Sequence, residues 1–434
     1  MITAWWGWAL MGVGVIAIIT LFVNLFSEVG ERPRRVTRVG ECAVGSVDFL
    51  LAIAGVTNSP VHRGGTARLL NNGVEFVPAM LAAIRGAERS VNFTTYMWID
   101  GCLSDLFFDA LVEAARRGVE VRVLVDGFGG RRAPRGRIGE LLRAGGAWCE
   151  FHPLRFGMLT RLHKRLHRRA LVVDGSIGFT GGASIMDKWM GDAEGPGEWR
   201  DSMIEVRGRL AVSLQSAFTQ VWAHTTGEML TGPAFYPPDA DQEETGHEEE
   251  TISRHVGFIA SPSSEAHPMR NIFWMTVRCA RKRIWITNPY FVPDNLFAAA
   301  LKERARAGVD VRVLLPNEHN DVTIIRWASR SFYGDMLKAG VRIFEYQPTM
   351  IHQKLLVADG VWSLVGSANI DVRSKELNQE NALGLLDHNF AARMEDTYLM
   401  DLNRSREILL RDWSRRFWAS RLIERFVRLF EKQY

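Results

Sequence analysis

Three segments in the first half of this 434-residue chain recur in the same order in its second half. Each segment shares its pattern of apolar and polar residues with its partner. The matched pairs are residues 90–98 with 283–292, 115–127 with 306–317, and 141–151 with 336–346. Ordered matches of this kind indicate that the body of the protein is an internal duplication.

The repeated segments alternate helix and strand signals. In the second pair a helical stretch ends at Gly118 or Gly308, and glycine is a typical helix C-cap. The strand that follows carries valine or leucine at every second position, which is the period of an extended chain. Helices alternating with strands imply crossover connections. We therefore expect an α/β fold with two pseudo-symmetric halves, each a mostly parallel or mixed sheet flanked by helices.

The composition between the repeats sets the expected domain boundaries. Residues 237–250 read PPDADQEETGHEEE, an acidic run without apolar periodicity that is typical of an exposed linker. Its carboxylates lack the spacing of metal ligands, so we predict no metal site there. The expected parts are a transmembrane anchor (1–30), a juxtamembrane segment (31–66), a first half (67–232), an acidic linker (233–253), a second half (254–405) and a C-terminal helix (406–434).

Four cysteines, Cys42, Cys102, Cys149 and Cys279, lie far apart in the sequence without CxxC or CxH spacing. We therefore predict neither a zinc site nor a disulfide framework, and expect buried thiols in a reducing compartment. Hydrophobic residues make up 47% of the chain and charged residues 24%, which excludes both a disordered chain and a polytopic membrane protein.

The N-terminal region has the length and polarity of a membrane anchor. Residues 4–26 carry no charge, and about 20 such residues in a helix cross a hydrocarbon core of roughly 30 Å. Tryptophans lie at one end of this run, and four arginines between residues 32 and 38 follow the other. The positive-inside rule then predicts an inner-membrane protein whose body faces the cytoplasm. A cleaved signal peptide is the alternative, although no basic region precedes the apolar run.

Two further segments carry membrane signals. Residues 49–56 are apolar but too short to span a bilayer, so they predict either an interfacial helix or one that packs on the body. Aromatic and aliphatic residues from Trp413 to Phe430 alternate with arginines at helical spacing. This pattern predicts a basic amphipathic helix, lying either in an anionic headgroup layer or against its own domain.

The duplicated halves also share a pattern of chemically active residues. The second half has His352, Lys354 and Asp359 in HQKLLVAD, followed by Asn369 in GSAN. The first half keeps the spacing in HRRALVVD and GGAS; its corresponding residues are His167, Arg169, Asp174 and Ser184. A histidine and a cation two residues apart on a strand point to the same face. One site could therefore hold both pairs.

These motifs resemble the signature of the phospholipase D superfamily, HxKxxxxD followed by GSxN, present twice. The second copy fits at every position, whereas Arg169 stands where lysine is usual and Ser184 where asparagine is usual. The resemblance extends over most of residues 67–402. The segments TNPYFVPD, WRD and LNQEN resemble the bacterial cardiolipin synthase branch.

The resemblance implies a covalent phosphohistidine mechanism without a metal or another cofactor. His167 would be the nucleophile and His352 the general acid, although the reverse assignment stays open. Arg169 and Lys354 would neutralise the phosphate, with Ser184 and Asn369 as hydrogen-bond donors.

Carboxylates are expected behind the histidines and at the motif ends. The resemblance places Glu380, from LNQEN, beside the second histidine, and leaves Asp201, from WRD, as the candidate partner of the first. For Asp174 and Asp359 we favour a bracing role over contact with substrate.

The motifs alone do not choose the substrate. The membrane signals favour phospholipids over nucleic acid, and the resemblance favours phosphatidyl transfer between two phosphatidylglycerol molecules, giving cardiolipin and glycerol. Hydrolysis to phosphatidic acid is the main alternative. A nuclease, and a scaffold that has lost catalysis, are less favoured. The oligomeric state is left open.

Overall fold

The computed structural model describes residues 11–15, 40–153, 163–238, 251–262, 266–416 and 424. Most of the predicted anchor, most of the acidic run and most of the C-terminal helix therefore lie outside the described residues. In the part of the chain that the structure describes, no helix combines the length and the apolar character that crossing a membrane requires.

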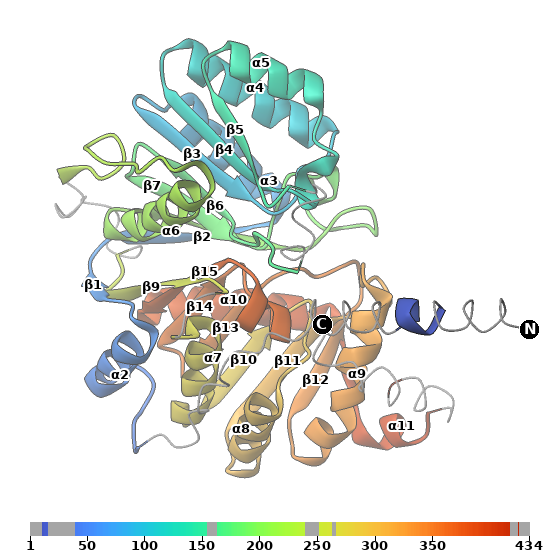
Figure 1. The fold of residues 1–434 in the computed structure, drawn as a ribbon. Helices are drawn as coiled ribbons and strands as arrows, with labels where there is room; N and C mark the ends of the chain where they lie inside the picture. Colours follow the sequence, from blue (N-terminus) through green and yellow to red (C-terminus); the bar gives the residue numbers. More distant parts are fainter. Residues whose placement is uncertain are drawn as a thin grey trace, which may run out of the picture.

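Two β-sheets form the body, one for each predicted half (Figure 1). The first has the order β2 (Thr66–Asn71), β8 (Ser202–Arg207), β7 (Ile177–Gly181), β6 (Ala170–Val173), β3 (Ser90–Thr95), β4 (Glu120–Asp126) and β5 (Ala147–Phe151). The second has the order β1 (Val61–Arg63), β9 (Arg254–Ala260), β15 (Glu380–Leu386), β14 (Trp362–Gly366), β13 (Leu355–Ala358), β10 (Arg283–Thr287), β11 (Asp310–Pro316), β12 (Arg342–Tyr346) and β16 (Ser405–Ile408). The second sheet also takes in residues 61–63 of the predicted juxtamembrane segment and residues 406–408, which were predicted to be helical but form an edge strand. Without the edge strands β1 and β16, the second order repeats the first, which confirms the duplication.

Each sheet is mixed, which is the second of the two arrangements expected from the sequence. Parallel pairing is confined to β3–β4–β5 in one half and β10–β11–β12 in the other. These are the strands that helices connect. The motif strands β6 and β13 instead turn directly into β7 and β14, and a short turn can join only antiparallel neighbours. The repeat search found the crossover units but not these hairpins.

The helices lie in three layers around the two sheets. One layer, α3 (Asn72–Arg85), α4 (Cys102–Arg116) and α5 (Arg135–Arg143), covers the outer face of the first sheet. Another, α2 (Val47–Thr57), α7 (Pro268–Cys279), α8 (Asn295–Arg306) and α9 (Thr323–Lys338), packs on the second. Helices α6 (Arg209–Thr226) and α10 (His388–Asn403) lie between the sheets.

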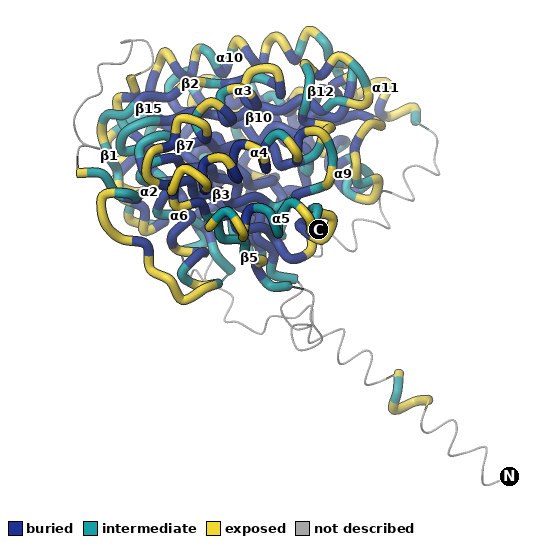
Figure 2. Tube along the Cα trace, turned by 90° about the horizontal axis from the view of Figure 1, so that it is seen from above, coloured by how far each residue is buried: buried dark blue, intermediate teal, exposed yellow. Residues whose placement is uncertain are grey.

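The two halves share one apolar cluster. Leu210 and Leu214 of α6 lie in it together with Phe390 and Met394 of α10 and inward-facing residues of both sheets. Figure 2 shows the resulting buried interior beneath an exposed rim. This shared core fixes the motif strands of one half relative to those of the other.

A disulfide joins Cys42 to Cys279, with the two Cα atoms 5.5 Å apart. The expectation of four buried free thiols was therefore wrong, and Cys102 is in addition exposed. The two bonded cysteines are 237 residues apart, so no sequence spacing marks the pair. They meet because the segment before α2 runs along the end of α7, where Val44 N–H donates to the Cys279 carbonyl at 3.2 Å.

Two predicted membrane segments pack on the second half where the structure describes them. Helix α2 buries Phe49, Leu50 and Ile53 in the core of that half, while Leu51 on its outer face is 64% exposed. In α11 (Leu410–Ser414), Trp413 is buried against Tyr333 of α9, with ring centroids 4.9 Å apart. The start of the C-terminal segment thus docks on its own domain.

Candidate active site

The two motif histidines lie just before β6 and β13, where the two halves meet. Each histidine segment forms a short parallel bridge with the other half, Leu166 with Gln379 and Ile351 with Arg200. The His167 N–H donates to the Gln379 carbonyl at 2.9 Å, and the His352 N–H donates to the Arg200 carbonyl at 2.7 Å. Each histidine segment thus makes a bridge and a backbone hydrogen bond to the other half, and the two sets of contacts are equivalent.

These reciprocal contacts place the carboxylate of each half beside the histidine of the other half. His167 Nδ1 lies 2.9 Å from Glu380 Oε1, and His352 Nδ1 lies 3.0 Å from Asp201 Oδ2. The expectation that each histidine pairs with the acid of its own half was therefore wrong. Glu380 and Asp201 each follow, by one residue, the position that bridges to the opposite histidine segment, and both are fully buried.

Further polar groups hold the two carboxylates. The Trp189 indole N–H donates to Asp201 Oδ2 at 2.9 Å, and the backbone N–H of Ser202 donates to Oδ1 at 2.9 Å. The Ser367 hydroxyl donates to Glu380, as does the Asn378 amide at 3.3 Å. Each imidazole ring is thereby oriented through Nδ1, which leaves Nε2 for chemistry.

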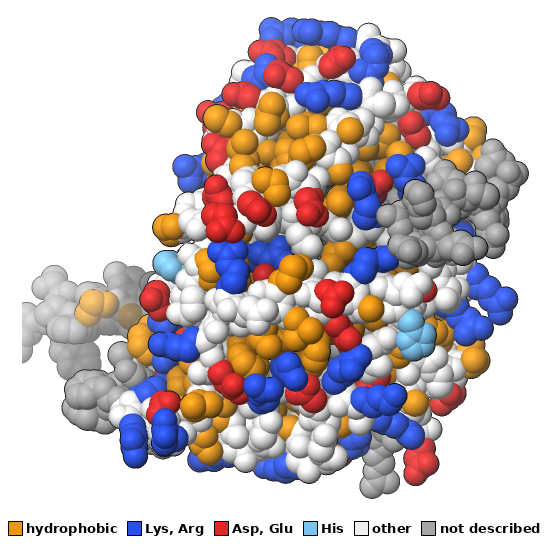
Figure 3. All heavy atoms as spheres, turned by 180° about the vertical axis from the view of Figure 1, so that it is seen from behind, with side chains coloured by type: hydrophobic (Ala, Val, Ile, Leu, Met, Phe, Trp, Pro, Cys, Tyr) orange, Lys and Arg blue, Asp and Glu red, His pale blue; other side chains and the backbone are white. Residues whose placement is uncertain are grey.

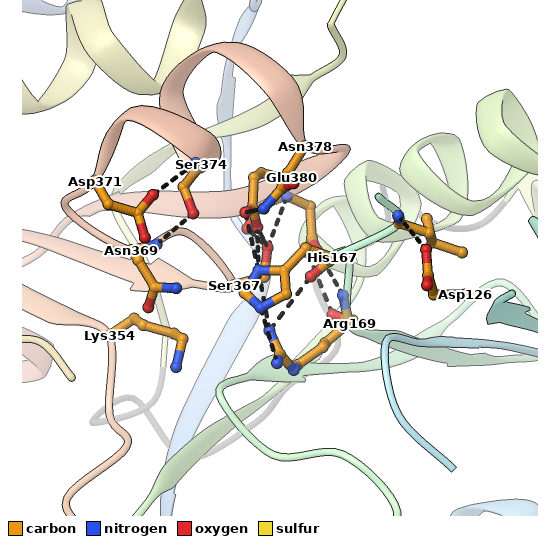
Figure 4. A network of polar contacts seen from close by, with 12 residues as sticks. Asp126, His167, Arg169, Lys354, Ser367, Asn369, Asp371, Ser374, Asn378 and Glu380 are labelled. Carbon is orange, nitrogen blue, oxygen red and sulfur yellow. Dashed lines mark hydrogen bonds and ion pairs between the residues drawn. The ribbon is translucent and has the colours of Figure 1, made fainter. Parts of the chain in front are cut away.

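Each motif cation lies beside the nitrogens of its own histidine, and Figure 4 shows this for Arg169 and His167. Arg169 Nη2 is 3.1 Å from His167 Nε2, and Lys354 Nζ is 3.1 Å from His352 Nε2. Arg169 also donates through Nε to the Ser184 hydroxyl at 3.1 Å. The two first-half departures from the motif are therefore in direct contact with each other. Asn369 is buried next to Lys354, as Figure 4 shows.

Burial and the neighbouring cations favour neutral imidazoles. Burial together with Arg169 lowers the pKa of His167 to about 4, and burial together with Lys354 lowers that of His352 to about 3. Both values lie well below the ~6.5 of a free imidazole. Burial also holds the pKa of the Lys354 ammonium well below its usual value, with Arg169 acting in the same direction.

The motif aspartates lie away from this centre. The Asp174 carboxylate accepts the backbone N–H groups of residues 88–90, and the Asp359 carboxylate accepts those of residues 281–283. Each is seven residues past its histidine, or roughly 23 Å along an extended strand. Both tie the end of a motif strand to the start of its neighbour, which is the bracing role that the sequence analysis favoured.

Several residues around the histidines were not found from the sequence. The ring of Tyr96 makes an edge contact with His167, and those of Trp189, Trp199 and Tyr290 surround His352. Asp126, at the end of β4, accepts the Leu166 N–H at 2.8 Å and so holds the residue before His167. Among the described residues, no three His, Cys, Asp or Glu side chains converge as metal ligands would.

The chain resembles known proteins over most of its length. A family model described as "Cardiolipin synthase, PLD-like domain" matches residues 80–199 and 276–402, one stretch in each half. Cardiolipin synthase of Halalkalibacterium halodurans is 31% identical over 377 residues, covering 86% of this chain and 73% of that protein. Cardiolipin synthase 2 of Bacillus anthracis is 33% identical over 367 residues, covering 83% and 69%.

Solved structures share the fold at low sequence identity. The crystal structure of a phosphatidylserine synthase from Haemophilus influenzae aligns with a TM-score of 0.68 at 14% identity, covering 88% of this chain and 98% of that one. A polyphosphate kinase from Porphyromonas gingivalis aligns with a TM-score of 0.52, also at 14% identity, covering 85% of this chain and 53% of the other.

Proposed function

Because this chain belongs to the phospholipase D-like cardiolipin synthase family, we propose that it joins two phosphatidylglycerol molecules into cardiolipin and glycerol. It is a phosphatidyltransferase of the phospholipase D superfamily. The observation that best supports the detailed chemistry is the pair of buried histidines, each with Nδ1 on a carboxylate and Nε2 beside a cation.

In the first step, His167 Nε2 attacks the phosphorus of the donor lipid. Its lowered pKa leaves the Nε2 lone pair unprotonated at neutral pH, and Glu380 stabilises the positive charge that develops on the ring. The bond from phosphorus to the glycerol headgroup breaks as a P–Nε2 bond forms. Arg169 and Lys354 stabilise the charge on the non-bridging oxygens.

His352 gives a proton to the departing glycerol oxygen. Burial and the neighbouring Lys354 lower the pKa of this imidazole, and an anionic phosphodiester beside Lys354 offsets the lysine charge and favours the protonated ring. In the second step His352 takes the proton of the acceptor hydroxyl, whose oxygen attacks phosphorus and releases His167. With water in place of the lipid alcohol, the same steps would yield phosphatidic acid.

A donor lipid whose leaving group needs no protonation tests the roles of His167 as nucleophile and His352 as general acid. With phosphatidyl-p-nitrophenol, a stabilised phenolate departs, so we expect His352→Ala to release p-nitrophenol in a first burst. With phosphatidylglycerol, the same variant should be slower than the parent by about 10²–10⁴-fold. His167→Ala should lose both reactions. The converse pattern would assign the nucleophile to His352, and activity retained in both variants would reject the mechanism.

Product analysis separates transfer from hydrolysis. Phosphatidylglycerol in mixed micelles should give cardiolipin and glycerol, identified by mass spectrometry, and both should disappear in the His167→Ala variant. Phosphatidic acid as the sole histidine-dependent product would instead identify a hydrolase.

Nucleic acid as the substrate is less well supported. On the face seen in Figure 3, the described lysines and arginines are interspersed with acidic and apolar side chains rather than gathered into one basic groove. A nuclease would in addition show DNA binding that weakens steeply with salt.

We also propose that residues 1–30 anchor the enzyme to the inner membrane. The four arginines that follow favour a cytoplasmic body, whereas the Cys42–Cys279 disulfide is typical of an oxidising compartment. Exposed Cys102 can decide between the two sides. A membrane-impermeant maleimide applied to intact spheroplasts should leave Cys102 unlabelled if the body is cytoplasmic, and label it if the body is outside.

A further inference from the structure

A short loop between β11 and α9 carries a carboxylate to the His352 side of the site. Asp321 is exposed, and the Tyr290 hydroxyl donates to its Oδ1 and Oδ2, each at 2.8 Å. Asn320 fixes the loop, because its amide donates to the Pro289 carbonyl at 3.3 Å and its side-chain oxygen accepts the Val322 N–H at 2.8 Å. The Asp321 carboxylate is therefore held in place beside the active site.

The surroundings of Asp321 connect it to the reacting groups. The Tyr290 ring makes an edge contact with the His352 ring at a centroid distance of 6.3 Å. Neighbouring atoms partly desolvate Asp321 and raise its pKa, while the Tyr290 hydrogen bond and the charges of Lys354 and Lys188 oppose that rise. A carboxylate here repels the non-bridging phosphate oxygens but accepts hydrogen bonds from neutral hydroxyls.

We propose that Asp321, oriented by Tyr290, binds the hydroxyls of a glycerol headgroup and selects glycerol as both leaving and acceptor alcohol. This inference rests on the proposed function, in which His352 protonates the leaving oxygen, so that the headgroup must lie on the His352 side. An ammonium headgroup fits less well, because the charges of Lys354 and Lys188 already stabilise the anionic form of this carboxylate. The selected hydroxyl gives its proton to His352 Nε2 while its oxygen attacks phosphorus and the P–Nε2 bond to His167 breaks.

Competition between two alcohols tests the subsite. The full-length enzyme receives phosphatidyl-p-nitrophenol with equal concentrations of glycerol and 1-propanol, and mass spectrometry gives the ratio of phosphatidylglycerol to phosphatidylpropanol. The parent enzyme should favour glycerol, and Asp321→Asn should lower this ratio by about tenfold or more. Tyr290→Phe should lower it less. Glu318→Gln, an equal charge change at an exposed position of the same loop, should leave the ratio unchanged.

Two results would overturn the proposed subsite. One is a parent enzyme that shows no preference for glycerol over 1-propanol, and the other is an Asp321→Asn variant with the same product ratio as the parent. Binding to the inactive His167→Ala variant separates this failure from failure of the proposed function. Calorimetry with glycerophosphoglycerol, glycerophosphopropanol and glycerophosphoethanolamine should rank the glycerol compound tightest, with the difference lost on adding Asp321→Asn. Tighter binding of the ethanolamine compound, or no effect of Asp321→Asn, would reject the subsite even if no p-nitrophenol is ever released.

Discussion

His167 Nδ1 lies 2.9 Å from Glu380 Oε1, although 213 residues separate the two in the chain. The reciprocal contact, from Asp201 to His352, spans 151 residues. Each half of the duplication therefore supplies a histidine to its own motif and a carboxylate to the motif of the other half. Neither half can assemble a complete site by itself.

Removing the two carboxylate charges should impair different steps. Glu380→Gln should slow the burst of p-nitrophenol by about 10²-fold, because the charge that develops on His167 during attack loses its partner. Asp201→Asn should spare that burst but slow the reaction of phosphatidylglycerol, since it acts through His352. Stopped-flow absorbance and lipid mass spectrometry measure the two rates. Equal effects of Glu380→Gln and Asp201→Asn on the burst would contradict the crossed assignment.

Arg169 and Ser184 should behave as a coupled pair. Arg169→Lys alone should lower kcat/KM by about tenfold, because a lysine cannot contact both Ser184 Oγ and His167 Nε2 as the guanidinium does. Adding Ser184→Asn restores the residue combination of the second half and should recover part of the activity. A double-mutant cycle measures the coupling. Strictly additive losses would show that the two positions act independently.

Asp359→Ala should destabilise the protein more than it alters the chemistry. Its carboxylate accepts three backbone N–H groups of residues 281–283, and their loss should cost about 2–4 kcal/mol in the free energy of unfolding. Asp174→Ala should cost a similar amount. Urea unfolding gives the stability, and kcat per folded molecule should stay close to the parent value. A large fall in kcat with parental stability would instead indicate a role at the phosphate.

Arg168 should contribute strongly to the stability of the interface between the two halves. This fully buried side chain donates to the carbonyls of Ala217 and Ala260 and to the side chains of Gln220 and Gln379. Arg168→Met leaves these acceptors without their donor and should lower the unfolding free energy by about 2–5 kcal/mol. Arg168→Lys keeps the charge but has fewer hydrogen-bond donors, so its unfolding free energy should lie between those of the parent and of Arg168→Met. Unfolding midpoints equal to the parent in both variants would contradict this account.

Stability should decrease as the solution is acidified below neutral pH. Burial and the adjacent cations lower the pKa of His167 to about 4 and that of His352 to about 3, whereas each titrates near ~6.5 in the unfolded chain. The unfolded state thus binds more protons between these values. The free energy of unfolding is therefore at its full value above about pH 6.5 and falls as pH drops toward 4.

Urea midpoints measured across this pH range test the linkage. A His167→Asn, His352→Asn double variant should show a shallower decline than the parent protein. If the two curves are parallel, other groups cause the acid sensitivity.

The sequence by itself determined the local and repeated features of this protein. The duplication and the helix–glycine–strand units follow from short-range patterns, because side-chain period, caps and turns are set by neighbouring residues. The motif spacing likewise identified both histidines and both cations. These features are repeated in the two halves, so each supports the other.

Only the tertiary structure decided which distant groups meet. The exchange of Glu380 and Asp201, the Cys42–Cys279 bond and the placement of Asp321 beside Tyr290 all depend on how separate segments close against one another. The hairpins that make each sheet mixed also escaped the repeat comparison. Packing of α6 and α10 into one shared core fixes the halves face to face, and no local pattern encodes that arrangement.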